Sequence, residues 1–98
     1  MDIELAALGF AAMGAPHRLG VLQLLVKAGD AGLKVGEVQA KSGIAASTLA
    51  HHLKALQEAG LITQQKQGRA TICRANYPQL EGLAGYILSE CCAEAPNG

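Results

Sequence analysis

Residues 45–60 have hydrophobic positions at the spacing of one helical face. Leu49, Leu53 and Leu56 lie at i, i+4 and i+7, so their side chains point to the same side of a helix. The opposite side is polar and carries Ser47, His51, Lys54 and Glu58. Such a helix is held by its leucine face and presents hydroxyl, imidazole and ammonium groups outward.

The preceding segment predicts a partner for this helix. Residues 35–42 carry Val35 and Val38 and are followed by Gly43, which predicts a shorter helix that ends at the glycine. Two helices joined by a tight turn that contains Gly form a helix-turn-helix unit. We therefore predict a helix-turn-helix at about residues 35–60, with 45–60 as the recognition helix of a DNA-binding domain.

Two further helices are predicted upstream. The first is weakly amphipathic and ends near Gly14, and its apolar positions are Ile3, Leu5, Leu8 and Ala12. The second begins at Pro16, because proline lacks only an N–H that the first helical turn leaves unpaired, and ends at Gly29. Its predicted buried stripe consists of Leu19, Leu22, Leu25 and Val26. Residues 32–34 are short but could add a minor strand.

Downstream, the pattern changes to short extended segments. Residues 61–67 and 70–76 are rich in Thr, Ile and Gln, and Gly68-Arg69 separates them, which predicts a β-hairpin at about 61–76 with Lys66 and Arg69 near its tip. A last helix is predicted at about 78–94. Its apolar face carries Leu80, Ala84, Ile87 and Cys91, with Leu83 beside them.

This order predicts a mainly α fold with a small β-hairpin, the winged helix-turn-helix (α-α-α-α-β-β-α), as one domain over residues 1–98. A chain of this length buries only about 60–65% of its unfolded surface, yet half of its residues are hydrophobic. Surplus apolar surface suits a homodimer formed through the first and last helices. The predicted interface residues are Leu5, Leu8, Leu80, Leu83, Ala84 and Ile87.

The net charge of zero conceals an uneven distribution. All eight basic residues lie between positions 16 and 74 together with three acidic ones, which leaves +5, whereas the flanks carry five acidic and no basic residues. A basic centre with acidic ends favours double-stranded DNA as the partner of the central segment. Ordinary solvated charge is the alternative interpretation.

The uncharged run from Leu5 to Pro16 is too short to span a bilayer. Asp2 and Glu4 occupy the region where a signal peptide would be basic. We therefore expect a cytoplasmic protein with no membrane partner. Three cysteines, an odd number, argue against a disulfide framework.

Three segments resemble the arsenic-repressor (ArsR/SmtB) family. Residues 15–22 (APHRLGVL) resemble its Asp-Pro-x-Arg-x-x-Ile-Leu motif, residues 47–56 (STLAHHLKAL) with 58–62 (EAGLI) resemble its recognition helix, and Gly68-Arg69 with Cys73-Arg74 resembles its wing. The match covers about residues 5–92. The resemblance implies a homodimeric transcriptional repressor that leaves its operator when an effector binds.

In a winged-helix dimer the recognition helices enter the major groove and the wings reach the flanking backbone or minor groove. The predicted DNA contacts are Ser47, Thr48, His51, Lys54, Lys66 and Arg69. Exposed polar residues without a DNA role are the alternative. Ala46 stands where the family often has a polar residue, so we expect few direct base contacts and a larger share for DNA shape and phosphates.

Three other side chains on the basic segment are assigned structural roles. His52 lies about 60° from the leucine stripe, at about 100° per residue, so we expect a hydrogen-bonded packing residue. For Arg18 and Arg74 we expect structural ion pairs.

Two metal sites of the family are absent from this sequence. Lys34 and Gly36 stand where a Cys-x-Cys motif would bind soft metals, and no His follows His52 to form a zinc site on the last helix. The resemblance leaves the vicinal pair Cys91-Cys92 as a candidate site for trivalent arsenic or antimony, with Cys73 or a cysteine of the partner subunit as the third thiolate. A redox- or sulfide-responsive switch and simple packing are the alternatives.

No cofactor is required in this interpretation, and no enzymatic activity is expected, because the sequence has no Gly-rich phosphate loop. A winged helix that binds only other proteins is the more remote alternative.

Overall fold

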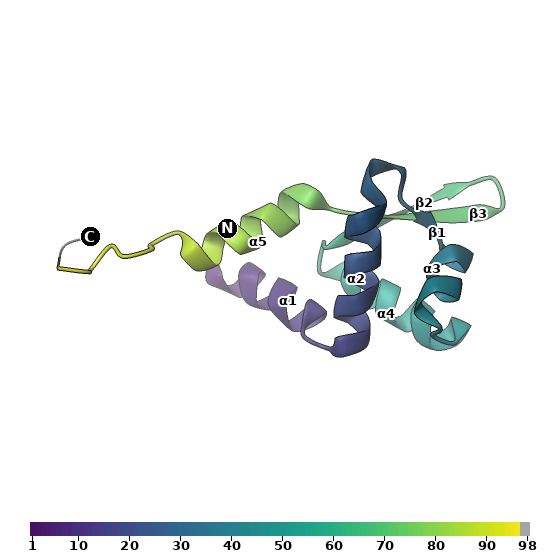
Figure 1. Ribbon diagram of the computed structural model, residues 1–98, viewed down its shortest axis with the longest axis horizontal. Coiled ribbons are helices and arrows are strands. Elements are labelled where there is room, and N and C mark those ends of the chain that lie inside the picture. Colours follow the sequence, from purple (N-terminus) through teal and green to yellow (C-terminus); the bar gives the residue numbers. More distant parts are fainter. Residues whose placement is uncertain (97–98) are drawn as a thin grey trace.

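The computed structural model describes residues 1–96, which form helices packed around a small antiparallel sheet (Figure 1). The elements in chain order are α1 (Ile3–Met13), α2 (Pro16–Ala28), the 3₁₀ turn η1 (Gly29–Ala31), β1 (Leu33–Lys34), α3 (Val35–Ser42), α4 (Ala46–Glu58), β2 (Ile62–Gln67), β3 (Ala70–Ala75) and α5 (Tyr77–Leu88). This order confirms the predicted winged helix-turn-helix. Residues 97 and 98 of the predicted domain 1–98 lie outside the described residues.

The sheet has the order β1-β3-β2, so the minor strand considered for residues 32–34 is present at one edge. Gln67 pairs with Ala70 across the two-residue turn Gly68-Arg69. Gly68 has a φ of +63°, the sign that primed hairpin turns require and that glycine adopts without steric cost. The hairpin forms the wing, which projects beyond the helices on the side away from α1 and α5 (Figure 1).

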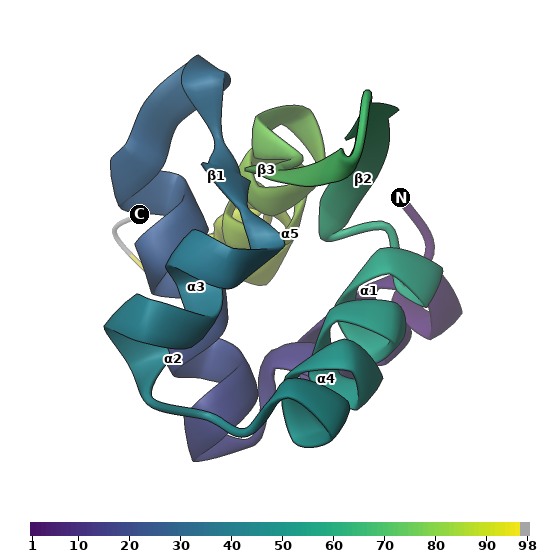
Figure 2. The same ribbon diagram turned by 90° about the vertical axis from the view of Figure 1, so that its right-hand side faces the viewer.

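The recognition helix is anchored as its pattern predicts. Leu49, Leu53 and Leu56 of α4 are buried in one cluster with side chains from α2, α3, β2 and β3. Full burial of a leucine contributes about 1.5–3 kcal/mol, so this stripe holds α4 firmly while its other face stays in solvent. Figure 2 looks onto α3 and α4 and the short connection between them, which begins at Gly43 in the left-handed conformation.

The predicted buried face of α2 is partly wrong. Val21, Leu22 and Leu25 are buried, whereas Leu19 and Val26 are exposed. Apolar residues surround most of α2, so more than one stripe fits its periodicity. The face that is buried is decided by the contacts of α2 with α3, α4 and β3.

Three of the four apolar side chains predicted on one face of α1, Ile3, Leu5 and Leu8, are exposed, and Ala12 is half-buried. Ala6 and Gly9 face the core instead, and a Cβ built on Gly9 would lie 2.8 Å from Leu83 Cδ1 of α5. Leu83 is only 1% exposed. Its predicted place in the dimer interface is therefore wrong, because it joins α5 to α1 within one chain. Leu80 is half-buried and also packs against this core.

The last helix is shorter than predicted. It ends at Leu88, and the N–H and hydroxyl of Ser89 both donate to the main-chain oxygen of Tyr86. Cys91 and Cys92 consequently lie in the turns that follow α5 and not on the helix.

No single helix among the described residues is long and apolar enough to cross a membrane; α1 and α2 with η1 meet the length and composition only as a pair bent by 97°. Three apolar side chains of α2, Val21, Leu22 and Leu25, are used in the domain core.

Candidate functional site

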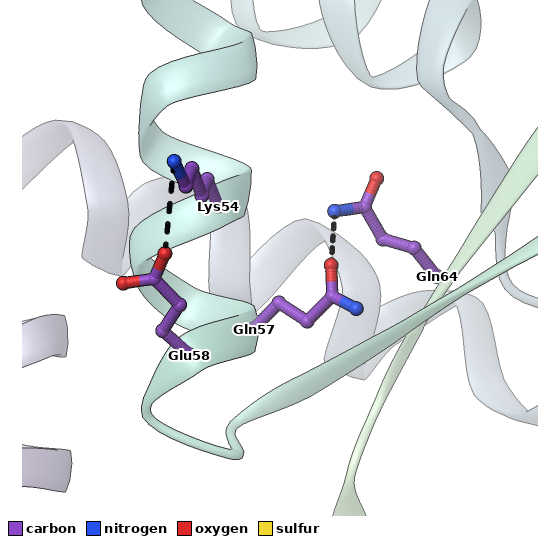
Figure 3. A network of polar contacts seen from close by, with 4 residues as sticks. All are labelled: Lys54, Gln57, Glu58 and Gln64. Carbon is purple, nitrogen blue, oxygen red and sulfur yellow. Dashed lines mark hydrogen bonds and ion pairs between the residues drawn. The ribbon is translucent and has the colours of Figure 1, made fainter.

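The four polar residues predicted on the recognition helix share its exposed side. Ser47, Thr48, His51 and Lys54 are all exposed, and the buried leucines point away from them. Lys54 Nζ lies 3.9 Å from Glu58 Oε1 in an exposed i,i+4 pair (Figure 3). A surface pair of this kind contributes little to stability, so the ammonium can exchange this partner for a phosphate at small cost.

The first turn of α4 is open to an external acceptor. Its N-cap is Ala45, which supplies no side-chain hydrogen bond, and the first main-chain bond of the helix runs from Leu49 N–H to Ala45 O. The main-chain N–H groups of residues 46–48 therefore have no partner within the helix. Together with the helix dipole they favour an anion such as a DNA phosphate. This feature was missed, although an alanine at position 45 is a sequence signal for it.

The wing adds two positive charges near the tip of the hairpin. Lys66 and Arg69 are both exposed, Lys66 pairs with Thr71, and Arg69 lies in the hairpin turn. No acidic residue occurs in residues 62–75. Exposed Lys34, which was not predicted as a DNA contact, lines the same hollow as Arg69, as does Glu37.

A side-chain hydrogen bond connects the recognition helix to the wing. Gln64 Nε2 on β2 donates to Gln57 Oε1 on α4 at 2.7 Å (Figure 3). The bond fixes one point of the wing relative to α4. The sequence pattern gave no indication of it, because glutamine side chains reveal a partner only once the strand and the helix are placed in space.

Arg74 and Arg18 contact main-chain oxygens, and within residues 1–96 neither forms the predicted ion pair. Arg74 donates from Nε to the main-chain oxygen of Asp30 at 2.9 Å and from Nη1 to Gln65 Oε1 at 2.7 Å. Arg18 Nε donates to the main-chain oxygen of Ala12. Arg18 thus contacts the main chain of the last turn of α1, and Arg74 contacts the main chain of η1.

His52 is a packing residue as predicted, but it lacks the predicted hydrogen bond within the described chain. Its ring stacks on His17 with centroids 6.1 Å apart and 5° between the planes, and its buried Nδ1 has no partner there. Burial, and then the positive charges of Arg18, His17 and His51, lower the pKa of the His52 imidazole. The neutral form is therefore favoured in the folded protein.

The three predicted thiols do not come together within one chain. Cys91 and Cys92 are exposed with their Sγ atoms 3.5 Å apart, and Cys92 has a φ of +62°. Cys73 is buried in β3, and this burial raises the pKa of its thiol. The 12-residue helix α5, about 18 Å long, separates β3 from the pair. Cys73 as the third thiolate of the same chain is therefore wrong.

No group of three or more His, Cys, Asp or Glu side chains in residues 1–96 is arranged to hold a metal ion. The histidines at positions 17, 51 and 52 stack or tilt against each other instead of converging on one point. The site built from these residues is a polar helix face with a basic wing.

Comparisons with known proteins agree with this architecture. A family model for a helix-turn-helix domain matches residues 13–65. The structure of an ArsR-like transcriptional regulator from Rhodococcus sp. RHA1 is 30% identical, with a TM-score of 0.77, and the alignment covers 93% of this chain and 82% of that one. NolR from Sinorhizobium fredii is 26% identical with a TM-score of 0.70, over 90% of this chain and 85% of that one.

A third structure shares the fold at lower identity. It is the homodimeric winged helix-turn-helix DNA-binding domain of a possible ArsR-family regulator from Mycobacterium bovis, 22% identical with a TM-score of 0.70, over 91% of this chain and 82% of that one. No curated protein sequence matches the chain. The fold, the helix-turn-helix match and the Rhodococcus relative together show that the chain belongs to the ArsR family of winged helix-turn-helix transcriptional regulators.

Proposed function

We propose that the protein is a cytoplasmic, homodimeric repressor that binds a specific double-stranded operator. The observation that carries the proposal is the exposed polar face of α4. The opposite face of this helix is anchored by buried leucines, and its first turn has no side-chain cap. Ser47, Thr48 and His51 supply the side chains that reach base edges or phosphates, and Lys54 adds a positive charge. Lys66 and Arg69 on the wing neutralise phosphates.

A homodimer is supported by the apolar residues that the described chain leaves in solvent. Five large side chains of α1 and α5 are between 55% and 70% exposed: Ile3, Leu5, Leu8, Ile87 and Leu88. Exposed Ala84 lies on the same helix as two of them. At about 25 cal/mol per Å² of apolar surface removed from water, covering these side chains with a second copy would stabilise the dimer.

Operator binding is tested by fluorescence anisotropy on the DNA directly upstream of the protein's own coding sequence, against a scrambled duplex. We expect a clear preference for the natural sequence. Replacing Ser47, Thr48 and His51 together with alanine should remove that preference without unfolding the domain, whereas Lys27→Ala, an exposed basic residue on α2, should leave it unchanged. No binding to either duplex would favour the protein-interaction alternative, and equal binding to both would contradict a specific operator.

For the effector we propose trivalent arsenic or antimony at Cys91 and Cys92. Two thiolates that bind one soft ion at about 2.3 Å must have their sulfur atoms within about 4.6 Å of each other, and here the Sγ–Sγ distance is 3.5 Å. Thiolate ligands favour such an ion over hard cations. A third thiolate would come from a second copy of the chain or from a small thiol, since Cys73 is buried elsewhere.

The same Sγ–Sγ distance supports a redox or sulfide response as a second candidate. Arsenite and a thiol oxidant are therefore titrated separately into the protein–operator complex. Release by arsenite alone, abolished by Cys91→Ser with Cys92→Ser and retained by Cys73→Ser, is the expected result. Release by the oxidant alone would favour the redox switch, and an operator complex indifferent to both would leave a repressor without a thiol effector.

A further inference from the structure

A groove of about 470 Å³ lies between α1 and α4, next to the start of α2. The two helices contact each other, and Figure 2 shows α1 passing behind α4. The walls are mainly apolar, and four of the lining side chains are small: Ala11, Ala12, Ala55 and Ala59. Leu8 contributes one edge. The volume is in the range of small-molecule sites, about 300–1,000 Å³.

One cation lines this groove without an acidic partner. Arg18 is half-buried, and its Nε donates to the main-chain oxygen of Ala12. The ion pair found in residues 1–96 joins Lys54 to Glu58, so no carboxylate within ion-pair distance compensates the Arg18 guanidinium. Guanidinium presents five N–H donors in a planar fork that matches a carboxylate. The donors that do not reach Ala12 can serve an anion in the groove.

The one acidic lining residue, Glu58, does not cancel this preference. Its side chain is 67% exposed, and its Oε1 lies 3.9 Å from Lys54 Nζ (Figure 3). The carboxylate is therefore largely solvated. The half-buried charge that a ligand would meet is Arg18.

We propose that this groove binds a small apolar carboxylate, with its carboxylate on Arg18 and its hydrocarbon part over the alanines. The site is separate from Cys91 and Cys92, neither of which lines the groove. Because its walls come from α1, which carries part of the exposed apolar surface, and from α4, an occupant would alter how the recognition helix sits on the dimer. That regulatory consequence rests on the proposed DNA-binding function; the binding itself does not.

The test is calorimetric titration of the full chain with octanoate as the probe, beside octanol and octylamine as neutral and cationic controls. We expect saturable binding of octanoate and at least tenfold weaker binding of both controls. Arg18→Gln should weaken octanoate binding at least tenfold. Ala55→Leu should do the same by filling the groove while leaving Arg18 in place. Lys27→Gln removes a positive charge from the same helix outside the groove and should have no effect.

A second readout is spectroscopic and reports on the charge of Arg18. The positive charge of Arg18 is among the causes that lower the pKa of His52, so a carboxylate bound to Arg18 should raise the His52 pKa in an NMR titration. Lack of saturable binding by the wild-type protein would overturn the proposal. Octanoate binding that both groove variants retain would also overturn it, because the probe would then be coating exposed apolar residues.

Operator binding is measured in parallel on the same protein preparations, in the absence of octanoate. If wild-type protein binds the operator but not octanoate, only the groove proposal fails. If it binds octanoate but not the operator, the groove stands and the proposed function fails. Circular dichroism of each variant checks its fold, and the two groove variants, on different helices, give independent tests.

Discussion

His52 shows how a single side chain makes the stability of this fold depend on pH. Its pKa is lowered from 6.5 in the folded chain, by burial first and then by Arg18, His17 and His51. The unfolded chain therefore binds more protons at this site. The stabilisation is fully present above pH 6.5 and is lost as the pH falls through the folded-state pKa.

Acidification from pH 7.5 to pH 5 should thus lower the free energy of unfolding, and His52→Gln should flatten this part of the profile. Urea denaturation at several pH values measures the effect, and an NMR titration of the wild-type imidazole should give a midpoint below 6.5. An unchanged profile in the variant would assign the acid sensitivity to other groups.

The proposed contact between Arg69 and a DNA phosphate makes a quantitative prediction. Arg69→Ala should weaken binding to all sequences alike and reduce the slope of log K against log salt by about 0.9, the value for one phosphate contact. Anisotropy titrations at several salt concentrations measure this slope, with Lys27→Ala as the matched loss of one exposed charge. A loss confined to one base position would instead place Arg69 in direct base readout.

Residue roles were predictable where helical spacing decides them and not where a partner lies far along the chain. The spacing of His52 from the leucine stripe placed it toward the packed side of α4. Its stacking on His17 and the main-chain partner of Arg18 depend on how α1, α2 and α4 meet. The sequence predicted ion pairs for Arg18 and Arg74, because it shows which residues are charged but not which main-chain oxygens lie within reach of them.

At the scale of elements, the bond between Gln57 and Gln64 should couple wing and recognition helix. A neutral hydrogen bond contributes about 0.5–1.5 kcal/mol, and the 2.7 Å bond is exposed. Gln57→Ala and Gln64→Ala should therefore change stability by less than about 1 kcal/mol each. Their effects on operator affinity should be non-additive, because the second substitution finds the bond already broken.

A double-mutant cycle of operator affinity measures this coupling, with Gln23→Ala on α2 paired with Gln64→Ala as the control. Additive effects of the two glutamines on α4 and β2 would show that the wing is positioned without their bond.

The buried face of a helix could be predicted only where its apolar residues lie on one side. Helix α4 has one leucine stripe opposite polar groups, so its buried face was fixed by periodicity. Helix α2 has apolar residues on most sides, and α1 turns Ala6 and Gly9 inward. There the faces are selected by shape, since the close approach of Leu83 to Gly9 leaves no room for a larger side chain. The end of α5 was missed because no Gly or Pro marks it.

At the scale of the whole molecule, substitutions of Leu83 and Ile87 should have different effects, although the two residues lie one helical turn apart. The first should affect the stability of the single chain and the second should affect dimerisation. Leu83→Ala should destabilise each folded chain by about 2–5 kcal/mol, the usual cost of emptying a buried leucine site, because Leu83 fills the space beside Gly9. Ile87→Asp should leave the core intact, since Ile87 is exposed in the single chain. It should separate the dimer, because a charge would then face the apolar surface of a second copy.

Light scattering after size-exclusion chromatography distinguishes the two variants. Ile87→Asp should run as a folded monomer whose urea midpoint does not depend on protein concentration, whereas the wild-type midpoint should rise with concentration, as dimerisation coupled to folding requires. Binding to a full operator should also weaken in this variant, because two recognition helices no longer arrive together. A dimer that survives Ile87→Asp would move the interface away from α5 and leave the exposed apolar residues of α1 to be covered in another way.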